Sequence, residues 1–160
     1  MLNVTLACVG KLKEAYWRDA CAEYAKRLQA FCKLNVVQID EARLPDDPSA
    51  AQIEAALDAE GQRLLSQVPS GAALIALCIE GKELSSTALS QQLMTWTVDG
   101  ISHVVLMIGS SFGLAPMVKQ AARLKLSMSP MTFPHQLARV MVLEQLYRAL
   151  QIAAGGKYHK

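Results

Sequence analysis

Five short runs of apolar, mostly aliphatic residues alternate along the chain with longer segments in which apolar residues return every three or four positions. The runs span residues 2–9, 34–39, 72–79, 103–108 and 124–128. Short apolar runs of this kind predict strands, and the longer periodic segments predict helices. The alternation of the two indicates the α/β class of folds.

Two of these segments, 72–79 and 104–108, are apolar at every position. A strand with one exposed face alternates polar and apolar residues, so an uninterrupted apolar run indicates a strand that is covered on both faces. We therefore expect a mostly parallel sheet between helix layers. Ligands bind to such sheets beyond the carboxyl ends of the strands. This rule places the expected site after Ile79 and Ile108, with Gly81 ending the third strand.

Capping residues and prolines mark the expected helices. Ser49 is suited to cap the second helix, because Gln52 stands at the third helical position and completes a capping box. Proline is favoured in the first turn of a helix. The expected helices span 14–30, 49–67 and 85–99, with a short one from Pro116 and a long one from Pro134 to Ala153.

The 160 residues, 52% of them hydrophobic, are enough for one compact domain, and no repeat or long linker divides them. We expect a single domain over residues 1–160. The longest apolar runs fall far short of the roughly 20 residues that a membrane helix needs. The first residues also lack the basic start and long apolar core of an export signal. The sequence therefore predicts a cytoplasmic protein.

The four cysteines show no C-x-x-C spacing, which favours reduced thiols that serve for packing. The three histidines show no i, i+4 pairing and have no acidic cluster beside them, so we expect no metal site. The net charge of +2 is distributed unevenly. Residues 1–118 hold nine basic and thirteen acidic residues, whereas residues 119–160 hold seven basic residues and Glu144 alone. The C-terminal quarter is either a solvated basic face or a nucleic-acid contact.

A glycine loop, residues 109–113, follows the fourth strand. Such a loop can hold an anion or an adenosine-type cofactor, and it can equally be a tight turn. It matches neither the G-x-G-x-x-G pattern nor a phosphate-binding loop that ends in Gly-Lys-Ser/Thr. The loop therefore argues against a dinucleotide and against a nucleoside triphosphate.

The last helix and its tail carry the remaining polar chemistry. His135 and Arg139 are four residues apart and share one face near the start of the helix, where His135 either handles substrate or only bonds nearby backbone. Glu144 and Arg148 have the spacing of a surface ion pair. Residues 137–153 are apolar on more faces than one core requires, which indicates a two-fold dimer. The tail, residues 157–160, combines an aromatic ring with potential cations.

Three blocks of the sequence closely resemble the RlmH methyltransferases, and the resemblance extends over the whole chain. They are Met131-Thr-Phe-Pro-His-Gln-Leu-Ala-Arg-Val, Glu144-Gln-Leu-Tyr-Arg-Ala and the terminal Tyr158-His-Lys. The opening Val9-Gly-Lys-Leu-Lys-Glu-Ala-Tyr-Trp and Gly61-Gln-Arg agree with them. The resemblance implies a SPOUT-type fold with a C-terminal trefoil knot, a homodimer, and S-adenosylmethionine as cofactor. It also implies methylation of N3 of a pseudouridine in large-subunit (23S) ribosomal RNA, on the assembled ribosome.

The same resemblance assigns residues to the site. The cofactor pocket would consist of Leu77, Gly109, Met128, Ser129, Pro130, Met131, Thr132 and Phe133. The hypothesis for the substrate is that His135 and Arg139 contact the target nucleotide together with Tyr158 and His159 of the partner's tail, and that one of the two histidines accepts the proton. The family commonly has Gly-Gly where this chain has Gly109-Ser110, which reduces backbone freedom there, and we expect binding to survive if Ser110 keeps a negative φ.

Two other functions compete with this one. A SPOUT enzyme acting on transfer RNA would share the cofactor pocket and bring an additional RNA-binding domain, which we do not expect in a single domain over residues 1–160. A ribosome-associated dimer that has lost the methyl donor would share the fold without the activity. A nicotinamide-dependent oxidoreductase is disfavoured, because its glycine fingerprint is missing.

Overall fold

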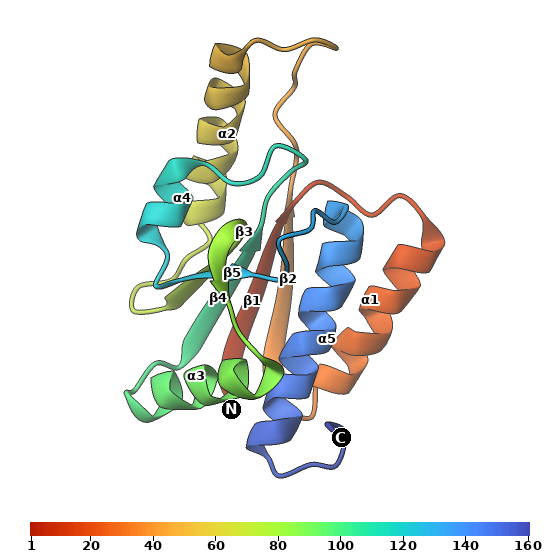
Figure 1. The fold of residues 1–160 in the computed structure, drawn as a ribbon, viewed down its shortest axis with the longest axis vertical. Coiled ribbons are helices and arrows are strands. Elements are labelled where there is room, and N and C mark those ends of the chain that lie inside the picture. Colours follow the sequence, from red (N-terminus) through yellow and green to blue (C-terminus); the bar gives the residue numbers. More distant parts are fainter.

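The computed structural model describes residues 1–160 and contains five strands and five helices that alternate along the chain (Figure 1). The strands are β1 (Leu2–Val9), β2 (Cys32–Ile39), β3 (Ala73–Glu83), β4 (His103–Ile108) and β5 (Leu124–Ser127). The helices are α1 (Ala15–Leu28), α2 (Ala50–Leu65), α3 (Ser86–Val98), α4 (Pro116–Ala121) and α5 (His135–Ala153). The expected α/β class is confirmed.

All strands run parallel, in the order β2-β1-β4-β3-β5. Helices cover both faces of this sheet (Figure 1). Successive side chains of a strand point to opposite faces, so Leu6 and Cys8 pack into one core cluster with α1, α3 and α5. Ala7 and Val9 pack into a second cluster with α2 and α4. This double burial explains the uninterrupted apolar runs and confirms the expected sheet between helix layers.

The second helix begins as its cap residues predict. The backbone N–H of Gln52 donates to Ser49 Oγ (3.1 Å), and the backbone N–H of Ser49 donates to Gln52 Oε1 (2.8 Å). The capping box is therefore confirmed. The helix ends at Leu65, two residues before the predicted end. None of the five helices has the length and apolarity that crossing a membrane requires.

The prediction that Gly81 ends the third strand is wrong, because β3 continues to Glu83. Lys82 pairs with Leu126 of β5 after a break in the register, and the residues of this break follow Leu77. A Cβ on Gly81 would lie 2.7 Å from the backbone oxygen of Lys125, so only glycine lets the two backbones come so close. The bulge turns residues 78–80 toward the edge where the loops gather. The trefoil knot stays a prediction.

Candidate active site

A cleft of about 800 Å³ lies where β3, β4 and β5 end, in the size range of sites for small organic molecules. The second half of β3 forms one wall, the glycine loop after β4 forms another, and the chain from the end of β5 into α5 forms a third. Figure 1 shows the connections that follow β4 and β5 at one end of the sheet, opposite the end marked N and C. The cleft therefore lies at the carboxyl ends of the strands, as expected from the fold class.

The glycine loop is a compact turn that leaves no room for a side chain at its first position. A Cβ on Gly109 would lie 2.1 Å from the backbone oxygen of Gly113. The Gly113 N–H donates to the backbone oxygen of Ser110 (2.9 Å), and Gly113 has a φ of +87°. No residue other than glycine has a positive φ, so Ser110 meets the condition set for it by the sequence. The missing Cβ of Gly109 thus makes room for the Gly113 carbonyl within the loop, and Gly109 borders the cleft.

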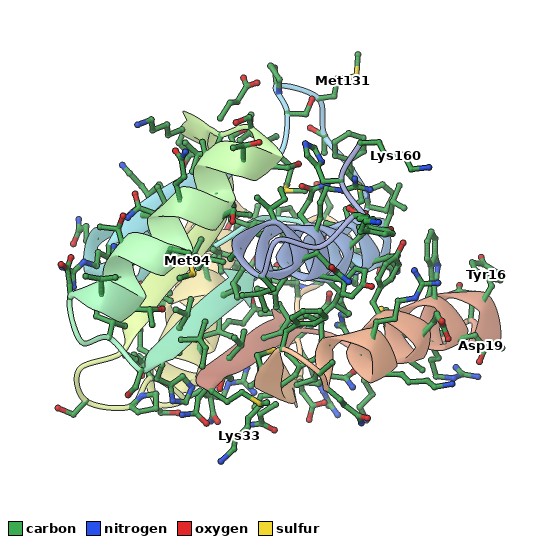
Figure 2. The ribbon with its side chains drawn as sticks, turned by 90° about the horizontal axis from the view of Figure 1, so that it is seen from below. Tyr16, Asp19, Lys33, Met94, Met131 and Lys160 are labelled. Atoms are coloured by element: carbon green, nitrogen blue, oxygen red, sulfur yellow. The ribbon has the colours of Figure 1, made fainter.

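Seven of the eight residues assigned to the cofactor pocket line this one cleft. They are Leu77, Gly109, Met128, Ser129, Met131, Thr132 and Phe133. Pro130 is exposed and does not line it. The segment is folded by its own side chains, since Ser127 Oγ donates to the backbone oxygen of Ser129 (3.1 Å) and the Met131 N–H donates to Ser129 Oγ (3.0 Å). Met131 extends into solvent at the edge of the molecule (Figure 2).

The cleft also holds charged residues that the sequence did not point to. Lys119 Nζ donates to Glu80 Oε1 across the cleft, from α4 to β3, and this hydrogen bond lowers the pKa of Glu80. Glu80 is therefore ionised at neutral pH. These partners are 39 residues apart in the sequence, and no local motif connects them. The thiol of Cys78 also lines the cleft, and its burial raises its pKa, so it is protonated at neutral pH.

His135 and Arg139 occupy different positions relative to the cleft, although they share a helix face. His135 lines the cleft, with its Nδ1 buried and without a hydrogen-bond partner. Arg139 is only 2% exposed and does not line the cleft. Its Nη2 donates to the backbone oxygen of Gly10 (3.1 Å). The structure therefore places the imidazole at the site and the guanidinium beneath it.

Tyr158 and His159 lie together against the second half of α5. The hydroxyl of Tyr158 donates to Glu144 Oε1 (3.1 Å), which also accepts from Arg148 Nη2 (2.6 Å). The Arg148 guanidinium stands 4.6 Å from the centre of the Tyr158 ring, and its Nη1 donates to His159 Nδ1 (3.3 Å). Burial, followed by the contact with Glu144, raises the pKa of the Tyr158 phenol. The tail thus forms a second polar cluster.

This tail cluster is separate from the cleft of its own chain. Glu144 follows His135 by nine residues on one continuous helix, which is about 14 Å along the axis. None of the residues of the tail cluster lines the cleft. Figure 1 shows the C-terminus at the end of the molecule opposite the loops that form the cleft. The structure therefore gathers the predicted site residues into two groups rather than one.

The family model and the relatives found by comparison with known proteins indicate the same kind of protein. A model of the family described as "Predicted SPOUT methyltransferase" matches residues 2–159. Proteins named Ribosomal RNA large subunit methyltransferase H are 44% identical in Bifidobacterium animalis, 45% in Clostridium novyi and 44% in Streptococcus thermophilus. Each alignment spans 159 residues, which is 99% of this chain and 100% of the relative. The chain therefore belongs to the SPOUT methyltransferase family.

Proposed function

We propose that this protein transfers a methyl group from S-adenosylmethionine to N3 of a pseudouridine in large-subunit ribosomal RNA, acting in the cytoplasm on assembled ribosomes. The observation that carries the proposal is the convergence of seven of the eight expected cofactor residues on one cleft. The names of the relatives, which are ribosomal RNA large subunit methyltransferases, support the choice of RNA.

The residues of the cleft suit S-adenosylmethionine. The cofactor has a flat adenine and an apolar methionine chain, and Leu77 and Met128 supply apolar walls for such groups. Gly109 borders the cleft in a tight turn that only glycine allows, and main-chain groups of such a turn can bond polar groups of a ligand. The Glu80 carboxylate accepts from Lys119 through Oε1, and a carboxylate in this position can also accept hydrogen bonds from hydroxyl groups.

When bound, the cofactor supplies an electrophilic methyl group, so the protein has two tasks. The first is to hold the target nitrogen in line with that methyl group, which alone accounts for a large part of the rate of such a transfer. The second is to deal with the proton that an imide nitrogen carries at neutral pH. His135 borders the cleft and has a ring nitrogen that is able to accept this proton. The other candidate is the partner's His159.

The site would be completed by a second subunit. The tail cluster lies at the opposite end of α5 from its own cleft, so within one chain Tyr158 and His159 do not reach the target nucleotide. Val140 and Met141 are only half-buried on α5, which leaves apolar surface for a partner helix. We infer a two-fold dimer in which each tail serves the cleft of the other subunit.

Methyl transfer with purified components tests this function. Ribosomes and free large subunits from a strain that lacks the gene would be incubated with the protein and S-adenosylmethionine, and nucleosides of the ribosomal RNA would be analysed by mass spectrometry. We expect one N3-methylpseudouridine per large subunit in assembled ribosomes and much less in free subunits. Methylation of another nucleoside, or no methylation of either substrate, would overturn the proposal.

Calorimetry with S-adenosylmethionine separates an enzyme from a binding module that has lost the donor. The enzyme is expected to bind the cofactor without RNA, because residues of one chain form all three walls described for the cleft. Absence of binding at millimolar cofactor would favour the binding module.

A further inference from the structure

The loop between β1 and α1 lies against the start of α5, although 125 positions separate Gly10 from His135 in the sequence. Gly10 has a φ of +92°, and its N–H donates to the backbone oxygen of Ile39 (2.8 Å). Its own backbone oxygen accepts from Arg139 Nη2. The loop is therefore held from two sides, by β2 and by α5.

The burial of Arg139 is unfavourable for the stability of the fold. Its side chain is 98% buried, and no acidic side chain forms an ion pair with it. Burial of an uncompensated cation is strongly unfavourable, and an apolar residue of similar size would fill the same space at lower cost. The hydrogen bond to Gly10 is the one polar contact that the guanidinium makes. This single hydrogen bond indicates that Arg139 serves to hold the backbone of Gly10.

Gly10 in turn supports the imidazole of His135. A Cβ on Gly10 would be in ordinary van der Waals contact with His135 Cε1 (3.5 Å) and Glu41 Oε1 (3.4 Å), so the backbone of Gly10 forms a floor that lies about one methyl group away from the ring. No hydrogen bond to His135 Nδ1 fixes the orientation of this ring. The position of this floor therefore limits how far the imidazole can turn away from the cleft.

A second observation marks the same place. The chain has three buried side-chain polar atoms without a hydrogen-bond partner, and they are Glu14 Oε2, His135 Nδ1 and Arg139 Nε. His135 Nδ1 and Arg139 Nε lie in the first turns of α5, and Glu14 is the N-cap residue of α1, four residues after Gly10. Buried polar atoms in folded proteins are nearly always paired. Departures from this rule are expected where function, rather than stability, has selected the residues.

We propose that Arg139 is a positioning residue, which holds the Gly10 carbonyl and thereby fixes the floor that directs His135 into the cleft. This role rests on the proposed function of His135 in handling the substrate. It differs from direct contact between Arg139 and the target nucleotide, because the guanidinium acts from beneath the cleft.

A matched pair of glycine variants tests the floor. Gly10→Ala and Gly100→Ala introduce a methyl group where φ is +92° and +90°, respectively, so the backbone strain is similar in the two variants. At Gly100 nothing lies within 4 Å of the added methyl group, whereas at Gly10 the methyl group would touch His135 Cε1 at 3.5 Å and fill the space between the backbone and the ring. We expect Gly10→Ala alone to shift the imidazole ¹H–¹⁵N signals of His135, assigned with a His135→Gln variant. Equal His135 spectra in the two variants would overturn the proposal.

Substitutions of Arg139 test the clamp. In Arg139→Met the hydrogen bond to Gly10 is lost while the apolar volume is largely kept, and in Arg139→Lys one donor remains. For Arg139→Met we expect displaced His135 signals, unchanged affinity for S-adenosylmethionine and unchanged KM for ribosomes. We expect kcat to fall about ten- to a hundred-fold, the effect of a displacement of roughly 1 Å in a catalytic group. Arg139→Lys should restore part of the rate.

Other results have distinct meanings. A raised KM for ribosomes with native His135 signals would show that Arg139 contacts RNA, and native values in every measurement would reduce it to a packing residue. Either result overturns the positioning role. Full turnover by His135→Ala would instead remove the proposed function of His135, while the signals of its ring in Arg139→Met would still report whether Arg139 positions it. If Arg139→Met fails to fold, the glycine pair decides.

Discussion

Gly109→Ala is the substitution whose effect the structure defines most sharply. The added Cβ would lie 2.1 Å from the oxygen and 2.4 Å from the carbon of the Gly113 carbonyl, whereas ordinary contacts begin at 3.4 Å. The obstacle is backbone, so no side chain can rotate away, and the loop must open by about 1 Å or more. Overpacking of this kind costs about 1–3 kcal/mol.

This cost should appear at the cleft. If the loop opens, Gly109 no longer presents its backbone to the cofactor, and 1–3 kcal/mol corresponds to roughly a five- to 150-fold loss of affinity, at about 1.4 kcal/mol per factor of ten. Calorimetric titration with S-adenosylmethionine measures it. Gly71→Ala is the control, because Gly71 lies outside the cleft, has a φ of +78° and has nothing within 4 Å of its Cβ position. Wild-type affinity in a folded Gly109→Ala protein would refute the assignment of the loop.

Three further predictions concern the tail and the walls of the cleft. Truncation after Gly156 should abolish methyl transfer to ribosomes and leave cofactor affinity unchanged, and retained turnover would contradict the shared site. Because its pKa is lowered, Glu80 stabilises the fold at a pH above the ordinary pKa of a glutamate carboxyl, and this effect is lost as the pH falls through the pKa of Glu80 in the folded protein. The free energies of unfolding in urea of wild type and Glu80→Gln should thus differ at pH 7 by less than about 1 kcal/mol, because the ion pair with Lys119 is partly exposed. The two free energies should agree near pH 3. Iodoacetamide should label Cys78 much faster at pH 9.5 than at pH 7, because the pKa of its thiol is raised, and bound cofactor should slow this labelling. If cofactor does not slow the labelling, Cys78 does not line the cofactor pocket.

Buried strands were the most predictable part of the fold. β1 and β4 have the predicted boundaries, because both are covered on two faces and their ends coincide with the ends of the apolar runs. The end of β3 was not predictable in this way. Its last residues are polar and are held by pairing with β5, more than 40 positions later, and the sequence around Gly81 contains no sign of that partner.

The candidate site likewise contains residues that the sequence predicted and residues that it did not. The resemblance supplied the pocket residues, and the helical spacing correctly placed His135 near the start of α5. Spacing alone put Arg139 on the face of His135, yet it does not tell whether a long side chain points into a cleft or under it. The ion pair between Glu80 and Lys119 depends on the packing of α4 against β3 and has no local signature. The features of the site that could not be predicted from the sequence therefore depend on contacts between residues far apart in the chain.

The central claim is that one active site requires the cleft of one subunit and the tail of the other. Co-expression of His135→Ala with a chain truncated after Gly156, each with its own tag, allows the mixed dimer to be purified. Each homodimer should be inactive on ribosomes, and the mixed dimer, which retains one intact site of two, should show about half of the wild-type turnover. An inactive mixed dimer, or an active truncated homodimer, would contradict the account.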